Sequence, residues 1–228
     1  MNIEYIGEQL YWGQIGRMLI ILSFTTSLLS SISFGFSFVR QDDSWKNIAR
    51  KAFYIHAASV VGIMSMLIVL ILRQRFEYYY VWEHSNKLMP LRYIFSCLWE
   101  GQEGSFLLWS FWHCVLGLLL IRKAGEWESP VMMTVSIVQA FIASMIMGVV
   151  ILGYKLGSNP FVLLRQHPDF ADLPFVKMPD YLSKIKDGRG LNPLLQNYWM
   201  TIHPPTLFLG FASTVVPFAF AIAALLSR

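Results

Sequence analysis

The sequence predicts an all-α protein, a polytopic transmembrane helix bundle in which residues 1–228 form a single domain. Two observations support this prediction. About five apolar stretches each approach the ~20 residues that a helix needs to cross the hydrocarbon core of a bilayer. Charged side chains make up only 14% of the chain, whereas soluble domains contain roughly 25%. This composition excludes an ordinary soluble domain.

The predicted spans follow one another without an internal repeat. Ile15–Val39 is the first, and its serine, threonine and glycine residues favour close packing against neighbouring helices. It is too long for a cleavable signal peptide and lacks a clean cleavage site, so we expect it to remain as an anchor. The other predicted spans are Ala52–Leu72, Gly104–Ile121, Pro130–Tyr154 and Pro204–Leu226.

Charge and cysteine content add little about function. The net charge of +4 does not indicate nucleic-acid binding, because basic residues beside membrane helices usually set topology and contact lipid headgroups. Cys97 and Cys114 form neither a CxxC pair nor a CxxCH haem-attachment motif. We expect both to be buried free thiols.

Five spans place the second loop, residues 73–105, and the fourth loop, residues 155–203, on one face of the membrane. Aromatic residues at span ends are usually interfacial anchors, but histidines and tryptophans on one surface would also suit a flat apolar ligand. Charge alone gives no firm orientation, since Arg73 and Arg75 conflict with an external second loop. The face carries His84, His167, His203, Trp82, Trp99 and Trp199.

The segment GRGLNPLLQNYWMTIHPPTLFLGFASTVVPFAFAIAALLS contains an LNPLLQ run followed by an HPP run. It is the longest of four ordered segments that resemble motifs of the CcmF-type cytochrome c haem lyase family. YVWEHSNKLMPLRY is similar to the family's YVxxHSNxxLPxxY, LWEGQEGSFLLW to its xWxxHEGSLLLW, and LGSNPF to its TSNPF. The resemblance covers almost the whole chain.

The resemblance implies that His203, the histidine of the HPP segment, is an axial ligand of haem iron at the outer membrane face. Local physics also places it near the membrane edge. A residue before proline is pushed out of the α region, and proline suits the first turn of a helix. We therefore expect His203 in extended geometry, just outside the fifth span. The alternative is an interfacial histidine bonded to water or backbone.

Other residues of the matched motifs are weaker candidates for cofactor binding: Pro204, Pro205, Trp99, Glu103 and His84. Glu100 and Glu103 have an alternative role in capping and anchoring the third span. Ser85 and Asn86 are good turn-forming residues, so the HSN segment has an alternative role in shaping the loop. The catalytic residues are unknown.

Two departures from the family pattern affect these expectations. Gln102 stands where the family has the histidine of HEGS, and an amide cannot easily replace an imidazole as an iron ligand. The family's WWxxWDPVE segment and second external histidine, which complete the haem platform, do not occur in this sequence. We expect the chain to be the N-terminal part of a haem lyase, from a split gene or a longer protein.

The remaining histidines fall outside the expected haem site. His56 and His113 lie inside predicted spans, where polar side chains are costly and often functional. We expect structural hydrogen bonds for both, because the family's intramembrane haem histidines lie in later spans. His167 precedes a proline in a loosely matched loop and is assigned no role.

The resemblance implies a membrane component of cytochrome c biogenesis that positions haem for covalent, thioether-forming attachment to apocytochrome c. Expected partners are apocytochrome c, a haem-delivery protein, the remaining haem lyase segment and the lipid bilayer. The expected location is the inner cell membrane, with the N-terminus and the second and fourth loops on the periplasmic face. The alternative is a structural or transport subunit of a respiratory membrane complex without its own haem.

Overall fold

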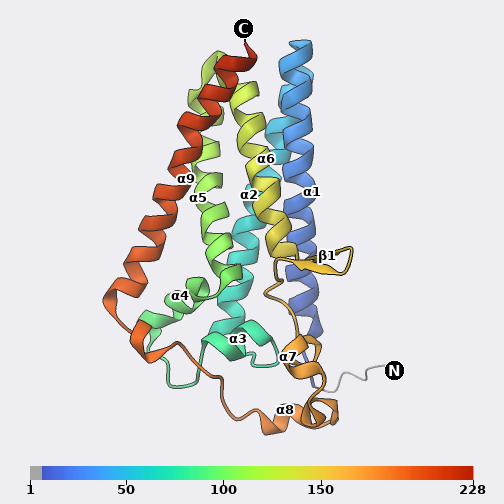
Figure 1. Ribbon diagram of the computed structural model, residues 1–228, viewed down its shortest axis with the longest axis vertical. Helices are drawn as coiled ribbons and strands as arrows, with labels where there is room; N and C mark the ends of the chain where they lie inside the picture. The colour runs from blue at the N-terminus through green and yellow to red at the C-terminus, as the bar shows by residue number, and fades with distance from the viewer. Residues whose placement is uncertain (1–6, 228) are drawn as a thin grey trace.

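The computed structural model describes residues 7–227, and five long helices dominate it (Figure 1). All five are long and apolar enough to cross a membrane. They lie alongside one another as a bundle, which confirms the predicted all-α class. The five are α1 (Leu10–Arg40), α2 (Asp43–Leu72), α5 (Gln102–Lys123), α6 (Glu128–Met147) and α9 (Tyr198–Leu226).

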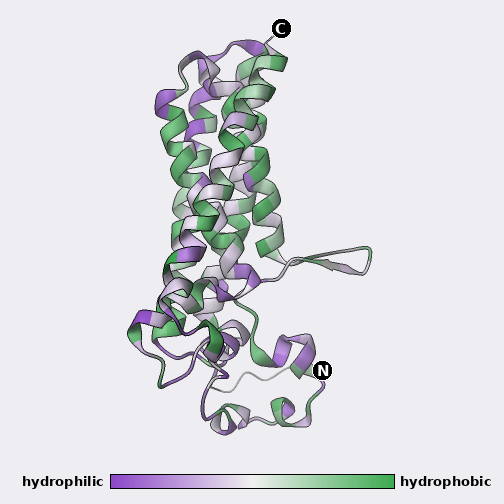
Figure 2. Cartoon of the chain, turned by 60° about the vertical axis from the view of Figure 1, so that its left-hand side comes forward, coloured by the Kyte–Doolittle hydropathy of each residue, from purple (hydrophilic) through white to green (hydrophobic). Residues whose placement is uncertain are grey.

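The shorter helices gather mainly at one end of the bundle, here called the loop end, together with the start of α1 (Figure 1). Hydrophilic residues are concentrated at the two ends, whereas the long helices between them are mostly hydrophobic (Figure 2). The second and fourth loops therefore share one face, as predicted. The elements there are α3 (Tyr79–His84), α4 (Leu91–Glu100), η2 (Leu164–Gln166), α7 (Pro168–Ala171), η3 (Pro174–Lys177), α8 (Tyr181–Lys184) and η4 (Pro193–Leu195); η1 (Gly125–Trp127) joins α5 to α6 at the opposite end.

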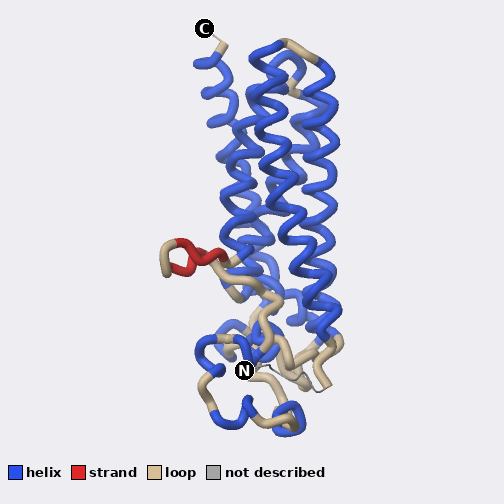
Figure 3. Tube along the Cα trace, turned by 90° about the vertical axis from the view of Figure 1, so that its right-hand side faces the viewer, coloured by secondary structure: helices blue, strands red, loops and turns tan. Residues whose placement is uncertain are grey.

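The predicted fourth span, Pro130–Tyr154, is too long at its C-terminal side. The helix ends at Met147 because Gly148 adopts a left-handed conformation, with φ 67°, which favours glycine. An antiparallel hairpin follows, formed by β1 (Val149–Ile151) and β2 (Tyr154–Leu156). It projects sideways from the bundle (Figure 3).

The second span begins nine residues before the predicted Ala52. Asp42 is the reason, because its side chain accepts a hydrogen bond from the backbone N–H of Ser44 and caps α2. The helix therefore starts in a polar stretch that hydropathy alone assigns to a loop.

Serines on one face of α1 join this helix to α2 and α6. The Ser30 hydroxyl lies 3.1 Å from that of Ser136 and donates to the Ala49 carbonyl at 3.2 Å. Ser37 and Ser129 are 3.0 Å apart. Small hydroxyl side chains let membrane helices approach closely and bond to one another, so these contacts join α1 to α2 and α6.

The two intramembrane histidines are part of this core. Nδ1 of His56 lies 3.1 Å from the Ser23 hydroxyl and 2.9 Å from the Ser23 carbonyl oxygen. This matches the structural role expected for His56. His113 is buried on α5, where its ring centroid lies 5.8 Å from that of Trp109. Its Nδ1 has no hydrogen-bond partner among the described residues, unlike the bond expected from the sequence.

The buried thiols expected from the sequence are confirmed, since Cys97 and Cys114 are both free and buried. Cys97 lies in α4, outside the five spans. Burial raises the pKa of its thiol to about 12, so this group remains protonated at neutral pH and is a poor nucleophile.

The loop end is tied to the start of α1 by polar contacts. The Tyr78 hydroxyl donates to the Gln9 carbonyl at 2.7 Å and accepts from the Gly13 N–H at 2.8 Å. Arg165, in the fourth loop, forms an ion pair of 2.8 Å with Glu8. These contacts connect the second and fourth loops to the same helix end.

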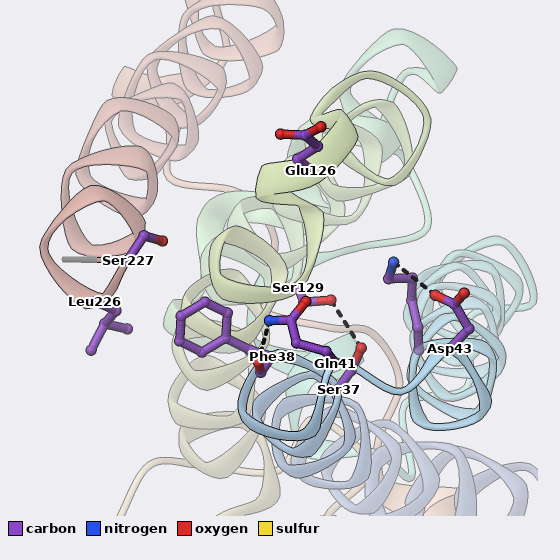
Figure 4. A pocket seen from close by; sticks show the side chains of 9 residues that line it. Ser37, Phe38, Gln41, Asp43, Glu126, Ser129, Leu226 and Ser227 are labelled. Atoms are coloured by element: carbon purple, nitrogen blue, oxygen red, sulfur yellow. Dashed lines mark hydrogen bonds and ion pairs between the residues drawn. The ribbon is translucent and has the colours of Figure 1, made fainter.

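A cavity of about 490 Å³ opens at the opposite end of the bundle. Figure 4 shows Ser37 and Ser129 pointing toward one another beside Gln41, with Glu126 and the end of α9 around them. This cavity lies at the far end of the long helices from the histidines of the two loops.

The Arg50–Glu128 ion pair yields a stability prediction. Both guanidinium contacts are short, at 2.6 and 2.5 Å, and the Glu128 side chain is only 4% exposed. Glu128→Ala removes the bidentate partner of Arg50. We expect a loss of about 2 kcal/mol, below the ~3–5 kcal/mol typical of breaking fully buried pairs, because the Arg50 side chain is 36% exposed.

Thermal unfolding of the purified protein in detergent measures this loss. Glu126→Ala is the matched control, since Glu126 is an exposed carboxylate two residues away. Equal melting temperatures for the two variants would contradict a stabilising role for the pair.

Candidate functional site at the start of α9

The helix that carries His203 is held by α4. The two elements pack against each other at the loop end, and side chains of α4 bond to the first turn of α9 and the segment before it. Because the contacts come from three successive turns of α4, they fix the position of the α9 start. They are Tyr93 hydroxyl to Gln196 carbonyl, 2.9 Å; Ser96 hydroxyl to Thr201 hydroxyl, 3.1 Å; and Trp99 Nε1 to Met200 carbonyl, 2.9 Å.

The structure corrects the expected geometry of His203. This residue lies inside α9, and so do Pro204 and Pro205. The helix begins at Tyr198 because the Asn197 side chain accepts a hydrogen bond from the Met200 N–H. Anchoring by α4 and the Asn197 cap outweigh the local tendency of a residue before proline to be extended.

The His203 side chain is exposed near the loop end of α9. Among the described residues, none forms a hydrogen bond or ion pair with its imidazole. The imidazole is therefore accessible to a group outside the described residues.

Exposed apolar and aromatic side chains lie in the first turns of α9 and on α4, the helix that packs against the start of α9. Trp199 and Tyr198 are 69% and 66% exposed, and Ile202 is 40% exposed. On α4, Leu91 and Phe95 are 68% and 49% exposed. Exposed apolar surface of this kind usually marks an interaction site or contact with lipid, and it suits one face of a flat apolar ligand beside a histidine.

His84 connects three of the motif segments. Its Nδ1 lies 3.0 Å from a carboxylate oxygen of Glu100, and the other oxygen of Glu100 accepts from the Asn192 N–H at 3.3 Å. The His84 imidazole therefore has a protein partner. His84 belongs to α3, whereas His203 belongs to α9. The contacts join α3, the end of α4 and the LNP segment before α9.

The turn between α4 and α5 is closely packed around Tyr80. A Cβ at Gly101 would lie 2.6 Å from His84 Nε2 and 2.6 Å from the Tyr80 ring, and one at Gly104 would collide with the Leu98 carbonyl oxygen. Burial, with nearby Glu103 as the next cause, raises the pKa of the Tyr80 phenol well above its usual value. This turn leaves no space for side chains at its glycines.

Glu103 and Gln102 differ in their surroundings. Glu103 is half-buried in the first turn of α5, where a carboxylate favourably meets the positive end of the helix. In the described part of the chain no side-chain hydrogen bond caps α5, so the contribution expected from Glu103 is electrostatic. Gln102 is exposed at the first position of the same helix.

His167 packs the fourth loop onto α3. Its ring stacks on Tyr79 with centroids 3.5 Å apart and planes at 3°, and its Nδ1 accepts from the Asp169 N–H at 3.4 Å. The residue therefore shapes the loop end.

Sequence reasoning missed the residues that position the site. Tyr93, Ser96 and Thr201 carry no motif signal, since their partners are remote in sequence. Asn197 could have been found, because asparagine before an apolar run is a recognised helix-start signal. Pro204 and Pro205 favour a later helix start, which is the start that the sequence predicts.

Comparison with known proteins supports the motif evidence. A sequence profile described as "Cytochrome C assembly protein" matches residues 99–228, more than half of the chain. The chain belongs to this cytochrome c assembly family. Membership favours cytochrome c biogenesis over the alternative of a respiratory-complex subunit.

Individual members of the assembly family align over nearly the whole chain. The chain is 32% identical to the cytochrome c-type biogenesis protein CcmF of Pseudomonas aeruginosa over 216 residues, covering 93% of this chain and 29% of that protein. It is 31% identical to CcmF of Escherichia coli over 218 residues, covering 94% and 30%. The chain thus spans under a third of these relatives.

A solved structure shares the fold. The protein titled "Cytochrome c Heme Lyase CcmF" superposes with a TM-score of 0.72 at 22% sequence identity, over 95% of this chain and 31% of that one. This chain is therefore a multi-pass membrane protein of the cytochrome c assembly family.

The packed turn yields a prediction about maturation of cytochromes c in cells. Gly101→Val and Gly104→Val should lower the yield strongly, because the new side chains collide with Tyr80, His84 or the Leu98 carbonyl. Gln102→Ala should reduce yield by less than about twofold, since an exposed side chain contributes little. Haem-stained cytochrome levels measure the effect, with membrane levels of each variant as the control. Full yield in both valine variants would rule out the packing argument.

Proposed function

We propose that this chain is the haem-holding N-terminal part of a cytochrome c haem lyase, with His203 as an axial ligand of haem iron. The main observation behind this proposal is that the His203 imidazole is exposed and has no protein partner among the described residues. The start of its helix is held in place by α4. Family membership supports haem as the ligand rather than another metal complex.

The residues described above would perform distinct tasks. His203 would hold the haem iron through an imidazole nitrogen and so keep the haem at the membrane edge. Trp199, Tyr198 and Phe95 are exposed and would offer it apolar surface. The haem would supply the vinyl groups to which the cysteine thiols of apocytochrome c add. The protein contributes orientation rather than a nucleophile of its own.

A second protein segment would complete the site. α9 is the least buried of the five spanning helices. One of its faces presents small or polar exposed residues in register with His203: Thr206, Gly210, Thr214, Pro217, Ala221 and Ala224. Small residues at such spacing suit close helix packing in a membrane. We assign this face to the remaining haem lyase segment, which would carry the tryptophan-rich platform and the second ligand.

The proposed location is the inner membrane, with the loop end on the periplasmic side. Haem attachment then takes place beside His203, where apocytochrome c and a haem-delivery protein gain access. Arg73 fits this orientation despite its charge, because it caps α2 and its guanidinium lies 5.3 Å from the Trp12 ring centroid.

Topology provides the first test of this proposal. Reporter tags inserted after Gln41 and after Gly125, at the end opposite the loops, should be active only in the cytoplasm. Tags after Lys87 and Lys186 should be active only in the periplasm. The reverse pattern would remove His203 from the compartment in which apocytochrome c receives haem, and the proposal would fail.

Replacement of the ligand provides the second test. In the complete haem lyase, His203→Ala should abolish or nearly abolish cytochrome c maturation and lower the haem that co-purifies, because no other side chain replaces the imidazole. Added imidazole should partly restore both, since the missing group is one neutral nitrogen. Absorption spectra and cytochrome yield measure these effects.

The matched control is His167→Ala, which removes an imidazole at the same end that stacks on Tyr79 and is not a proposed ligand. It should retain haem. Wild-type haem content and maturation in His203→Ala, at normal membrane levels, would show that His203 is an interfacial anchor.

A further inference from the structure

α9 continues through two prolines near its start. In an α-helix each N–H bonds to the carbonyl four residues earlier. Pro204 has no N–H, so the Met200 carbonyl loses its partner within the helix. An unpaired backbone carbonyl in an apolar environment is costly, and the first turns of α9 need a replacement donor.

Trp99 supplies that donor. Its indole N–H points at the Met200 carbonyl oxygen, with Nε1 at 2.9 Å. The bond thus occupies the very acceptor that Pro204 leaves open. Ser96, one turn earlier on α4, adds a bond to Thr201, the neighbour of Met200.

This arrangement differs from that of other tryptophans nearby in sequence. The Nε1 atoms of Trp109 and Trp112, both on α5, are buried without a hydrogen-bond partner in the described part of the chain. An indole N–H is therefore not satisfied at every position of this bundle. At Trp99 it meets an acceptor created by a proline in another element.

The bond also lies close to the proposed ligand. Met200 and His203 are three residues apart in one helix, and residues at this spacing lie on neighbouring positions of one face. His203 directly precedes Pro204. A shift of the Met200 turn relative to α4 would move the imidazole with it.

We propose that Trp99 is a positioning residue for haem attachment: its indole N–H replaces the helix hydrogen bond that Pro204 removes, and so sets the position of His203. The inference rests on the proposed function of His203. In this proposal Trp99 acts by bonding to the backbone of α9. The sequence motif had instead suggested that Trp99 contacts haem.

A double-mutant cycle in the complete haem lyase tests the proposal. Trp99→Phe keeps an aromatic ring and removes the N–H, and should weaken haem retention about fivefold, the usual scale of one hydrogen bond. Pro204→Ala restores a backbone N–H that can bond to Met200. In that background Trp99→Phe should change haem retention by less than about twofold.

A second readout does not depend on haem. With ¹³C-carbonyl methionine, the NMR signal of Met200 reports its hydrogen bond. Trp99→Phe should shift this signal, and Pro204→Ala should compensate. Trp109→Phe is the matched control, because its N–H has no partner to lose; it should leave both the Met200 signal and haem retention at wild-type values.

The outcomes separate this inference from the proposed function. If His203→Ala retains haem, the ligand assignment is wrong, whatever the Met200 signal does. If His203→Ala loses haem but Trp99→Phe leaves the Met200 signal unchanged, the positioning role of Trp99 is wrong. Equal effects of Trp99→Phe on haem retention with and without Pro204 would also overturn it, because the two residues would then act independently.

Discussion

The structure depends on the requirement that polar backbone groups in a bilayer be satisfied within the protein. Long helices meet it along most of the chain, but they must also hold one another without a strong hydrophobic driving force. The serine face of α1 provides that association. Ser30 and Ser37 bond to hydroxyls of α6, and Ser23 bonds to His56 of α2. Small polar groups thus join these helices within a core that also contains large apolar side chains such as Phe34 and Phe53.

The same requirement explains the contacts at the loop end, where prolines interrupt the backbone hydrogen bonds of α9. Prolines in α9 remove backbone donors, and α4 lies where its side chains can replace one of them. Close packing of Gly101 and Gly104 against Tyr80 sets the turn from which α5 begins. Backbone carbonyls at this end are therefore satisfied by side chains of another element, as the bonds from Tyr93 to Gln196 and from Trp99 to Met200 show.

The motif segments of the sequence converge in space. His84 of the HSN segment bonds to Glu100 of the WEG segment, and Glu100 accepts from Asn192 of the LNP segment. Trp99 links the WEG segment to the helix that carries HPP. The shared motifs of this assembly family thus describe one connected scaffold around the start of α9. The chain itself spans under a third of the length of these relatives.

Hydropathy was sufficient to predict the five spans, their order and the shared face of the two long loops, because burial in lipid depends on composition over about 20 residues. The motifs were sufficient to predict the family. Only the packed structure decided that His203 is helical, that α6 ends at Met147 and that His84 is paired with Glu100. Each of these outcomes depends on a specific cap, a left-handed glycine or a partner remote in sequence. Local preference favoured an extended His203, but tertiary hydrogen bonds from α4 and the Asn197 cap outweigh it.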